Sequence, residues 1–201
     1  MVNTKRVVRD VVVVGASAGG VEALRQLFSA IPAGFPGVIA VVQHRHPLHA
    51  GKLPEVLGRG ARVRIREPHA RVPVEPGNVY LAPRDRHMTF ADGSIRLERG
   101  PKVHATRPAA DPLFLSAAQA YGERVVGVVL TGGGDDGVDG LIGIKAAGGV
   151  SIAQDPDEAT YPFMPRNAIV YDEVDLVLPV REIAEALVAL AEGKTVVERA
   201  A

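Results

Sequence analysis

Residues 11–20 read VVVVGASAGG, and this stretch decides the fold. Four β-branched valines in a row are typical of a parallel strand that is buried on both faces. The glycines that follow permit a sharp turn from strand to helix, which would lift the Ser17 hydroxyl above the edge of a sheet. The free N–H groups of the next helix would point at the same place and favour a developing negative charge. The stretch therefore predicts a strand, a turn and a helix, with Ser17 as a candidate nucleophile.

Apolar strands alternate with amphipathic helices along the rest of the chain. Such alternation predicts an α/β fold, a doubly wound, mostly parallel sheet with helices on both faces. The middle section, with short strand candidates at 63–66 and 78–82 and a hairpin over 87–97, is expected to be a small antiparallel insertion. The expected strands of the main sheet span residues 11–14, 37–43, 124–130, 150–153 and 175–178.

Length and composition fit one domain over residues 1–201, with a core at about 8–191, because a chain that is 47% hydrophobic can bury a sizeable core. Lys+Arg and Asp+Glu number 23 each, so no overall charge favours nucleic acid or an anionic membrane. The lack of cysteine excludes disulfides, thiol nucleophiles and cysteine metal sites. No apolar run approaches the ~20 residues of a membrane helix, and the first ten residues are charged, unlike a signal peptide. We therefore expect a cytoplasmic protein without direct membrane insertion.

Polar residues that follow the apolar strands are the candidates for chemistry, because ligands bind beyond the carboxyl ends of parallel strands. His44 ends the second expected strand, and Asp136 follows the third within the glycine-rich run TGGGDDG at residues 131–137. If His44 lies beside Ser17, it could act as a general base, and Asp136 could orient its imidazole. Alternatively, Asp135 and Asp136 could cap the next helix, or one could cap while the other reaches the histidine.

The glycine and serine turn also fits a phosphate-binding or purely structural turn, since glycine-rich turns open dinucleotide-binding folds too. A dinucleotide site usually has an acidic residue about 20 positions further on, which holds the ribose. No Asp or Glu lies between Glu22 and Glu55. The sequence thus argues against a nucleotide cofactor, and we expect none.

A zinc site is a second alternative, carried by histidines. His44, His46 and His49 have the histidine spacing of a metal-hydrolase loop. Leu48 occupies the position where that loop has an acidic residue, so a metal ligand or base would be missing. We therefore expect no metal.

Taken together, these motifs resemble the catalytic domain of CheB-type chemotaxis methylesterases, from about Val11 to Leu187. The resemblance implies a protein-glutamate methylesterase and glutamine deamidase with Ser17 as nucleophile, His44 as base and Asp136 as orienter. That chain order differs from the Ser, Asp, His order of α/β-hydrolases. The motifs are Gly15–Gly20, Gln43-His44, Ala82-Pro83 with His87, Arg107-Pro108 with Asp111 and Leu113-Phe114, Leu130–Gly132, Asp136-Gly137 and Phe163–Arg166.

Two departures from the family pattern concern the expected oxyanion hole. Ala18 stands where the family usually has threonine, and Gly133 where it usually has methionine. Their backbone N–H groups remain the candidate oxyanion donors, on a loop that Gly133 makes more flexible. These departures leave room for a second function class, a receptor-binding or signalling module of the same fold with weak turnover.

The implied substrate is the methylated cytoplasmic helical bundle of a chemoreceptor, which is rich in glutamate. A basic rim would suit it, although any of these arginines could equally be solvated or structural. The family's receiver domain has no counterpart in the about ten residues before the first strand, which leaves a stand-alone esterase, constitutive or under a separate regulatory protein, or an excised domain. The candidate rim comprises Arg45, Arg84, Arg86, Arg107 and Arg166.

Overall fold

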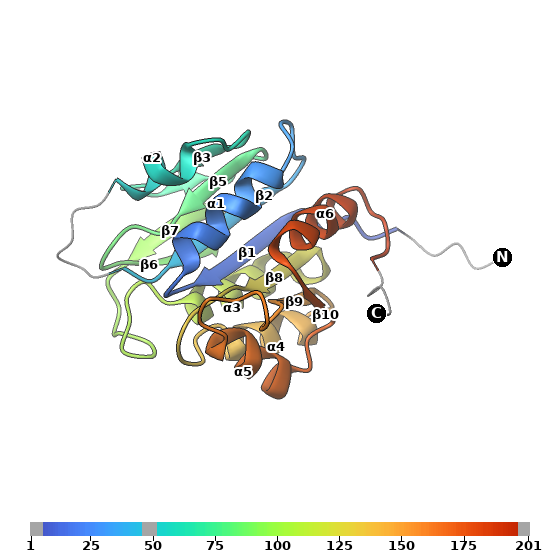
Figure 1. Ribbon diagram of the computed structural model, residues 1–201. Coiled ribbons are helices and arrows are strands. Elements are labelled where there is room, and N and C mark those ends of the chain that lie inside the picture. The colour runs from blue at the N-terminus through green and yellow to red at the C-terminus, as the bar shows by residue number, and fades with distance from the viewer. Residues whose placement is uncertain (1–5, 46–51, 197–201) are drawn as a thin grey trace.

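The computed structural model describes residues 6–45 and 52–196, and within these ranges its main sheet has seven strands. These strands are β1 (Val11–Ala16), β2 (Val38–Gln43), β3 (Arg64–Arg66), β5 (Asn78–Leu81), β8 (Val125–Val129), β9 (Val150–Gln154) and β10 (Leu176–Leu178). They run parallel in the order β10-β9-β8-β1-β2-β5-β3 (Figure 1). This arrangement confirms the mostly parallel sheet that the sequence predicts.

Helices cover both faces of the sheet (Figure 1). The side chains of Val12 and Val14 pack into the core under one set of helices, and those of Val11 and Val13 into the core under the other. The valine run is therefore buried on both faces, as its β-branched composition predicts. One face carries α1 (Gly20–Ala30), α2 (Leu53–Gly58) and α6 (Val180–Ala191), and the other carries α3 (Ala110–Tyr121), α4 (Val138–Ala146) and α5 (Phe163–Asp172). None of the helices in the described ranges has both the length and the apolar character needed to cross a bilayer.

A second, antiparallel sheet packs on the side of α3 and contains β4 (Val72–Pro73), β7 (Ser94–Glu98) and β6 (His87–Ala91), in that order. The prediction that the whole middle section is an antiparallel insertion is wrong for β3 and β5, which belong to the parallel sheet. Short strands carry no signal of direction. Here α2 carries the chain back across the sheet, and such a crossover returns the next strand in parallel.

The sheet reverses its direction of winding between β1 and β8. The chain passes from β1 to β2 on one side and later returns to β8 on the other side. The crevice beyond the carboxyl ends of β1 and β8 is therefore the switch point at which doubly wound sheets bind ligands. Two backbone turns leave the sheet there, and the Ser17 N–H donates to the Thr131 carbonyl across them at 3.0 Å.

Candidate active site

Ser17 lies directly after β1, half-buried, at the turn into α1. Gly19 adopts a left-handed conformation (φ 76°), which permits the sharp turn. Gly132, in the turn after β8, packs against the serine. A Cβ on Gly132 would lie 2.7 Å from the Ser17 Cβ and would overlap the Met164 sulfur. The sequence therefore needs glycine at position 132 for Ser17 to stand where it does.

His44 follows β2, which pairs with β1 in parallel register, and its N–H donates to the Ala16 carbonyl at 2.9 Å. The imidazole Nε2 lies 2.6 Å from the Asp136 Oδ2. Nδ1 is thus the ring nitrogen left to accept a proton from another group. Within the described ranges, no hydrogen bond joins the Ser17 hydroxyl to His44, and such bonds often tighten only when substrate binds. The structure brings the predicted base and acid into contact, and the serine to the adjacent strand end.

Asp136 is 2% exposed, and its carboxylate accepts three hydrogen bonds. Besides His44, the donors are the N–H groups of the first two residues of α3, Ala110 at 2.6 Å and Asp111 at 3.1 Å. Burial alone would raise the pKa of Asp136, but the hydrogen bonds from His44 and Ala110 outweigh it and hold the pKa below its ordinary value. The alternative in which Asp135 or Asp136 caps the next helix, α4, is wrong, because their side chains contact His104 and His44 and the start of α3. The Asp136 side chain caps α3, because α3 begins beside the turn that follows β8.

The N-terminus of α4 is capped in return by Asp111, from the first turn of α3. Its Oδ1 accepts from the N–H groups of Gly137 at 3.0 Å and Gly140 at 2.8 Å. Burial, which is the main cause, and the charge of Asp136 raise the pKa of Asp111. The two helices therefore cap each other. Sequence reasoning gave Asp111 no such role, although an aspartate in a first helical turn is a capping signal.

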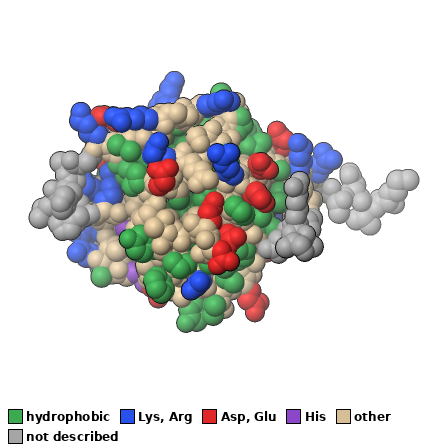
Figure 2. Space-filling view, in the orientation of Figure 1, with side chains coloured by type: hydrophobic (Ala, Val, Ile, Leu, Met, Phe, Trp, Pro, Cys, Tyr) green, Lys and Arg blue, Asp and Glu red, His purple; other side chains and the backbone are tan. Residues whose placement is uncertain are grey.

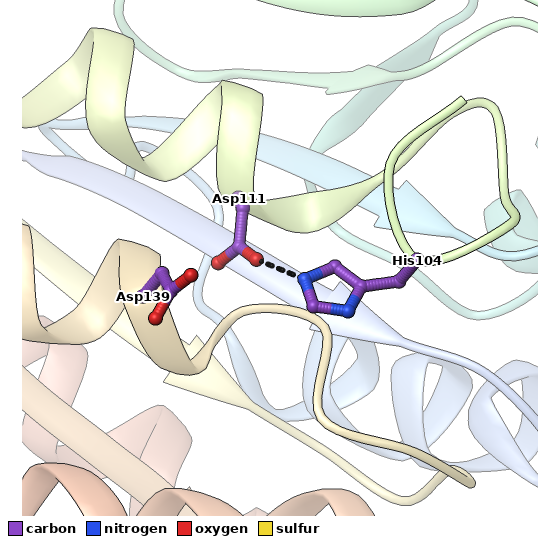
Figure 3. Close-up of side chains that lie close together, drawn as sticks. All are labelled: His104, Asp111 and Asp139. Carbon is purple, nitrogen blue, oxygen red and sulfur yellow. Dashed lines mark hydrogen bonds and ion pairs between the residues drawn. The ribbon is translucent and has the colours of Figure 1, made fainter. Parts of the chain in front are cut away.

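His104, in the loop between β7 and α3, faces carboxylates with both ring nitrogens. Its Nε2 lies 2.8 Å from the Asp111 Oδ2 (Figure 3). Its Nδ1 lies 3.0 Å from the Asp135 Oδ1. Partial burial lowers the pKa of His104, but the bond to Asp111 and the charges of Asp136 and Asp135 raise it overall. Both nitrogens can donate only in the imidazolium form. Sequence reasoning missed this residue, because no motif marks it.

Ligand atoms of His104, Asp111 and Asp139 lie within 4.8 Å of one another, a donor set whose atom types suit a metal ion (Figure 3). Both oxygens of Asp111 already accept N–H hydrogen bonds, however. Because both Asp111 oxygens already have partners, the arrangement favours a hydrogen-bonded cluster over a metal site. The zinc alternative needs His46 and His49 besides His44, and these two residues lie outside the described ranges.

A pocket of about 420 Å³ opens beside His44. The Thr106 hydroxyl oxygen lies in its wall, 3.5 Å from the His44 Nε2, a contact that sequence reasoning did not foresee. At the end of the molecule where β1 ends, Figure 2 shows histidine side chains near Lys and Arg side chains. The described lining residues are His44, Arg45, Asp85, Lys102, Ala105, Thr106, Arg107 and Pro108.

Two of the five rim arginines line this pocket, and both already have partners. Arg45 donates to the Ala82 carbonyl at 2.6 Å and pairs with Glu67 at 3.0 Å. Arg107 pairs with Asp85 at 2.5 Å. The described lining does not include the other three arginines, of which one is half-buried and two are exposed. These are Arg84, Arg86 and Arg166.

The two candidate oxyanion donors, Ala18 and Gly133, lie at the exposed ends of the turns after β1 and β8. Neither N–H group donates a hydrogen bond to any of the described residues. The Thr131 hydroxyl donates to the Ala18 carbonyl at 3.0 Å and so ties the two turns together. A Cβ on Gly133 would meet nothing within 4 Å, so this position is open.

A serine turn, a histidine–aspartate pair and unpaired backbone N–H groups at the switch point of a doubly wound sheet define a candidate site of the serine hydrolase class. The sequence model of the CheB methylesterase family matches residues 12–187. The chain therefore belongs to the CheB methylesterase family.

Individual relatives agree with this family. The chain is 44% identical over 178 residues to protein-glutamate methylesterase/protein-glutamine glutaminase 2 of Anaeromyxobacter dehalogenans, a match that covers 89% of this chain and 52% of that protein. It is 39% identical to a protein-glutamate methylesterase/protein-glutamine glutaminase of Pyrococcus horikoshii, over 92% of this chain and 51% of that protein. The chain thus spans about half the length of these two relatives. The crystal structure of the Thermotoga maritima CheB methylesterase catalytic domain matches with a TM-score of 0.85 and 34% identity, over 90% of this chain and 98% of that one.

Proposed function

We propose that this chain is a protein-glutamate methylesterase acting in the cytoplasm. It would hydrolyse glutamyl γ-methyl esters on the cytoplasmic helices of methylated chemoreceptors, and deamidate glutamine side chains there. The observation that carries the proposal is the 2.6 Å contact between His44 and the buried Asp136, at the strand end next to Ser17. The family and the names of the relatives supply the reaction class.

In the proposed mechanism, the Ser17 hydroxyl gives its proton to the His44 Nδ1 as its oxygen attacks the ester carbonyl carbon. The carbonyl oxygen becomes negative and accepts from the N–H groups of Ala18 and Gly133. One such donor is typically worth about 10²–10³ in rate. Collapse breaks the bond to the methoxy group, which takes the proton from His44 and leaves as methanol. From a glutamine substrate the leaving group is ammonia.

Water completes the cycle by attacking the acyl-enzyme. His44 removes a proton from the water and returns it to the Ser17 oxygen as the acyl bond breaks, so that a glutamate side chain leaves and the enzyme is regenerated. Asp136 stays ionised because its pKa is held low, although burial opposes this, by hydrogen bonds from His44 and the start of α3. Its charge stabilises the imidazolium that forms twice in each cycle.

Charge at the pocket supports an acidic substrate. Of the three basic residues that line it, Arg45 and Arg107 are paired with Glu67 and Asp85, whereas Lys102 is exposed to solvent and carries the attraction. A helix rich in glutamate would be attracted to this wall over a range set by the ionic strength. We therefore expect the turnover to fall as salt is raised, and a flat response between low and high salt would remove the basic wall from the proposal.

The deciding experiment is methanol release from receptor membranes that carry labelled methyl esters. We expect Ser17→Ala to abolish release, whereas Ser29→Ala, an exposed serine on the outer part of α1, leaves it unchanged. Unaltered methanol release by Ser17→Ala would reject Ser17 as the nucleophile. If the wild-type chain releases no methanol and a serine-directed organophosphonate does not label it in a manner that depends on His44, the receptor-binding module becomes the better description.

A further inference from the structure

Two buried glutamines end β9 and β2, the strands on the outer sides of β8 and β1. Gln43 is the last residue of β2 and Gln154 is the last residue of β9, and each residue is only 3% exposed. In the sheet, β2 lies beside β1 and β9 lies beside β8. We propose that Gln43 and Gln154 are positioning residues, which hold the serine turn and the oxyanion turn in register for the proposed reaction.

The Gln43 amide holds the serine turn to the histidine. Its Nε2 donates to the Ser17 carbonyl at 2.7 Å and to the His44 carbonyl at 3.0 Å. The opposite orientation of the amide would set its oxygen against both carbonyls. In the observed one, Oε1 faces Gly20, the first residue of α1, where the helix dipole is positive and where a Cβ would overlap it. One side chain thus fixes the spacing between the backbones of the nucleophile and the base.

The Gln154 amide performs the complementary task on the other side of the crevice. Its Oε1 accepts from the Thr131 N–H at 2.8 Å, two residues before the candidate oxyanion donor Gly133. Its Nε2 donates to the Glu158 carboxylate at 3.0 Å, which fixes the orientation of the amide. Gln43 acts as a donor and Gln154 as an acceptor, so each matches the backbone group that its neighbouring turn presents.

The two glutamines act on turns that are already joined to each other, through the Ser17 N–H and the Thr131 carbonyl. Loss of the Gln43 amide would leave the His44 carbonyl without this donor, and the Ser17 carbonyl with only the Gly20 N–H. Loss of the Gln154 amide would leave the Thr131 N–H without this acceptor, so either loss would let the turns shift relative to one another. A misplacement of about 1 Å near reacting groups can cost about 10² in rate. The expected consequence is a fall in kcat, because ground-state binding in the pocket beside His44 does not involve either glutamine.

The test compares Gln43→Met and Gln154→Met with Asn78→Leu. Asn78 is a matched control, since it is buried and its amide also donates to two carbonyls, those of Glu75 and Pro76, each at 3.2 Å. It is the first residue of β5, so it lies at the amino ends of the parallel strands, away from the crevice at their carboxyl ends. We expect each Met variant to lower kcat for methanol release by about 10- to 100-fold with KM unchanged within about twofold, while Asn78→Leu keeps its kcat per folded molecule.

A variant that replaces the amide by a carboxyl group adds a pH readout that a merely structural role would not change. Gln43→Glu presents a carboxylate to the carbonyls of Ser17 and His44, and it regains a donor only when it is protonated. We expect its kcat relative to wild type to recover as the pH falls. Relative activity that is independent of pH, or a loss in the Met variants that only follows the folded fraction as in Asn78→Leu, would overturn the proposal.

The inference rests on the proposed function, so the experiment includes a readout without turnover. Amide hydrogen exchange should speed up at residues 17–20 in Gln43→Met and at residues 131–134 in Gln154→Met. If the wild-type chain releases no methanol, the proposed reaction fails and the exchange data alone decide on the glutamines. Unchanged exchange in both turns would then reject their positioning role.

Discussion

Replacement of Asp136 by asparagine removes a buried negative charge that three N–H donors share. The Oδ2 accepts from His44 and Ala110, each at 2.6 Å, and the Oδ1 accepts from Asp111 at 3.1 Å. The best arrangement of the new amide keeps its oxygen at the doubly used position. Its NH₂ group then faces the N–H group of Asp111, donor against donor, in a site that is closed to water.

The cost can be worked from these contacts. A buried donor left unpaired costs about 1–3 kcal/mol, and each of the two remaining bonds changes from charge-assisted to neutral, a loss of about 1 kcal/mol each. We therefore expect Asp136→Asn to lower the free energy of unfolding by about 3–5 kcal/mol. That loss corresponds to a fall in Tm of roughly 6–20 °C for a chain of this size. Turnover should fall by about 10⁴, as it does when the aspartate of a serine-protease triad is replaced by asparagine.

Asp111→Asn is the matched control. Asp111 also caps a helix, by accepting hydrogen bonds from two backbone N–H groups, and it also contacts a histidine, His104. We expect a comparable loss of stability in urea unfolding, but a kcat within about tenfold of wild type. If Asp136→Asn folds and keeps its turnover within about tenfold, the assignment of Asp136 as orienter is wrong. The folded-state pKa of Asp136 is lowered from 3.8, so its stabilising effect is present above that pH and lost as the pH falls through the folded value.

Three further outcomes follow from the same geometry. The folded-state pKa of His104 is raised from 6.5, so its stabilising effect is full below that pH and is lost as the pH rises through the folded value. In urea unfolding, the difference in free energy of unfolding between wild type and His104→Asn should therefore shrink at alkaline pH. Gly132→Ala should cost about 1–3 kcal/mol and lower turnover, because the new methyl group displaces Ser17 or Met164. Gly133→Ala, in open space, should leave the melting temperature within about 2 °C of wild type. Equal melting temperatures for the two alanine variants would contradict the packing described around Gly132.

The fold could be predicted from the sequence where the periodic signal is strong. Four valines fix β1 as a strand buried on both faces, and the apolar runs that end at Gln43 and Leu130 place two further strands. The direction of β3 and β5 could not be predicted, because segments of three and four residues carry no information on pairing partners. That direction depends on the crossover through α2, which is a property of the assembled sheet.

The candidate site could be predicted only as far as strand ends could be located. Ser17, His44 and Asp136 each follow an apolar run, so the parallel topology brings them to one edge. The partners of their side chains were beyond reach. Asp136 caps a helix that begins 26 positions earlier, and the pocket arginines already bind Glu67 and Asp85, contacts that only the folded chain creates.

The reciprocal capping of α3 and α4 makes each helix a condition for the other. A chain that ends before Asp136 leaves the first turn of α3 without acceptors, and a chain that lacks α3 leaves α4 without Asp111. Asp136 is also the residue that holds His44. The β2 and β8 parts of the sheet must therefore come together before His44 acquires its partner Asp136. In a partly folded chain, Ser17 would lie without a histidine held by Asp136. Under the proposed function, activation of Ser17 is in this way restricted to the completely folded chain.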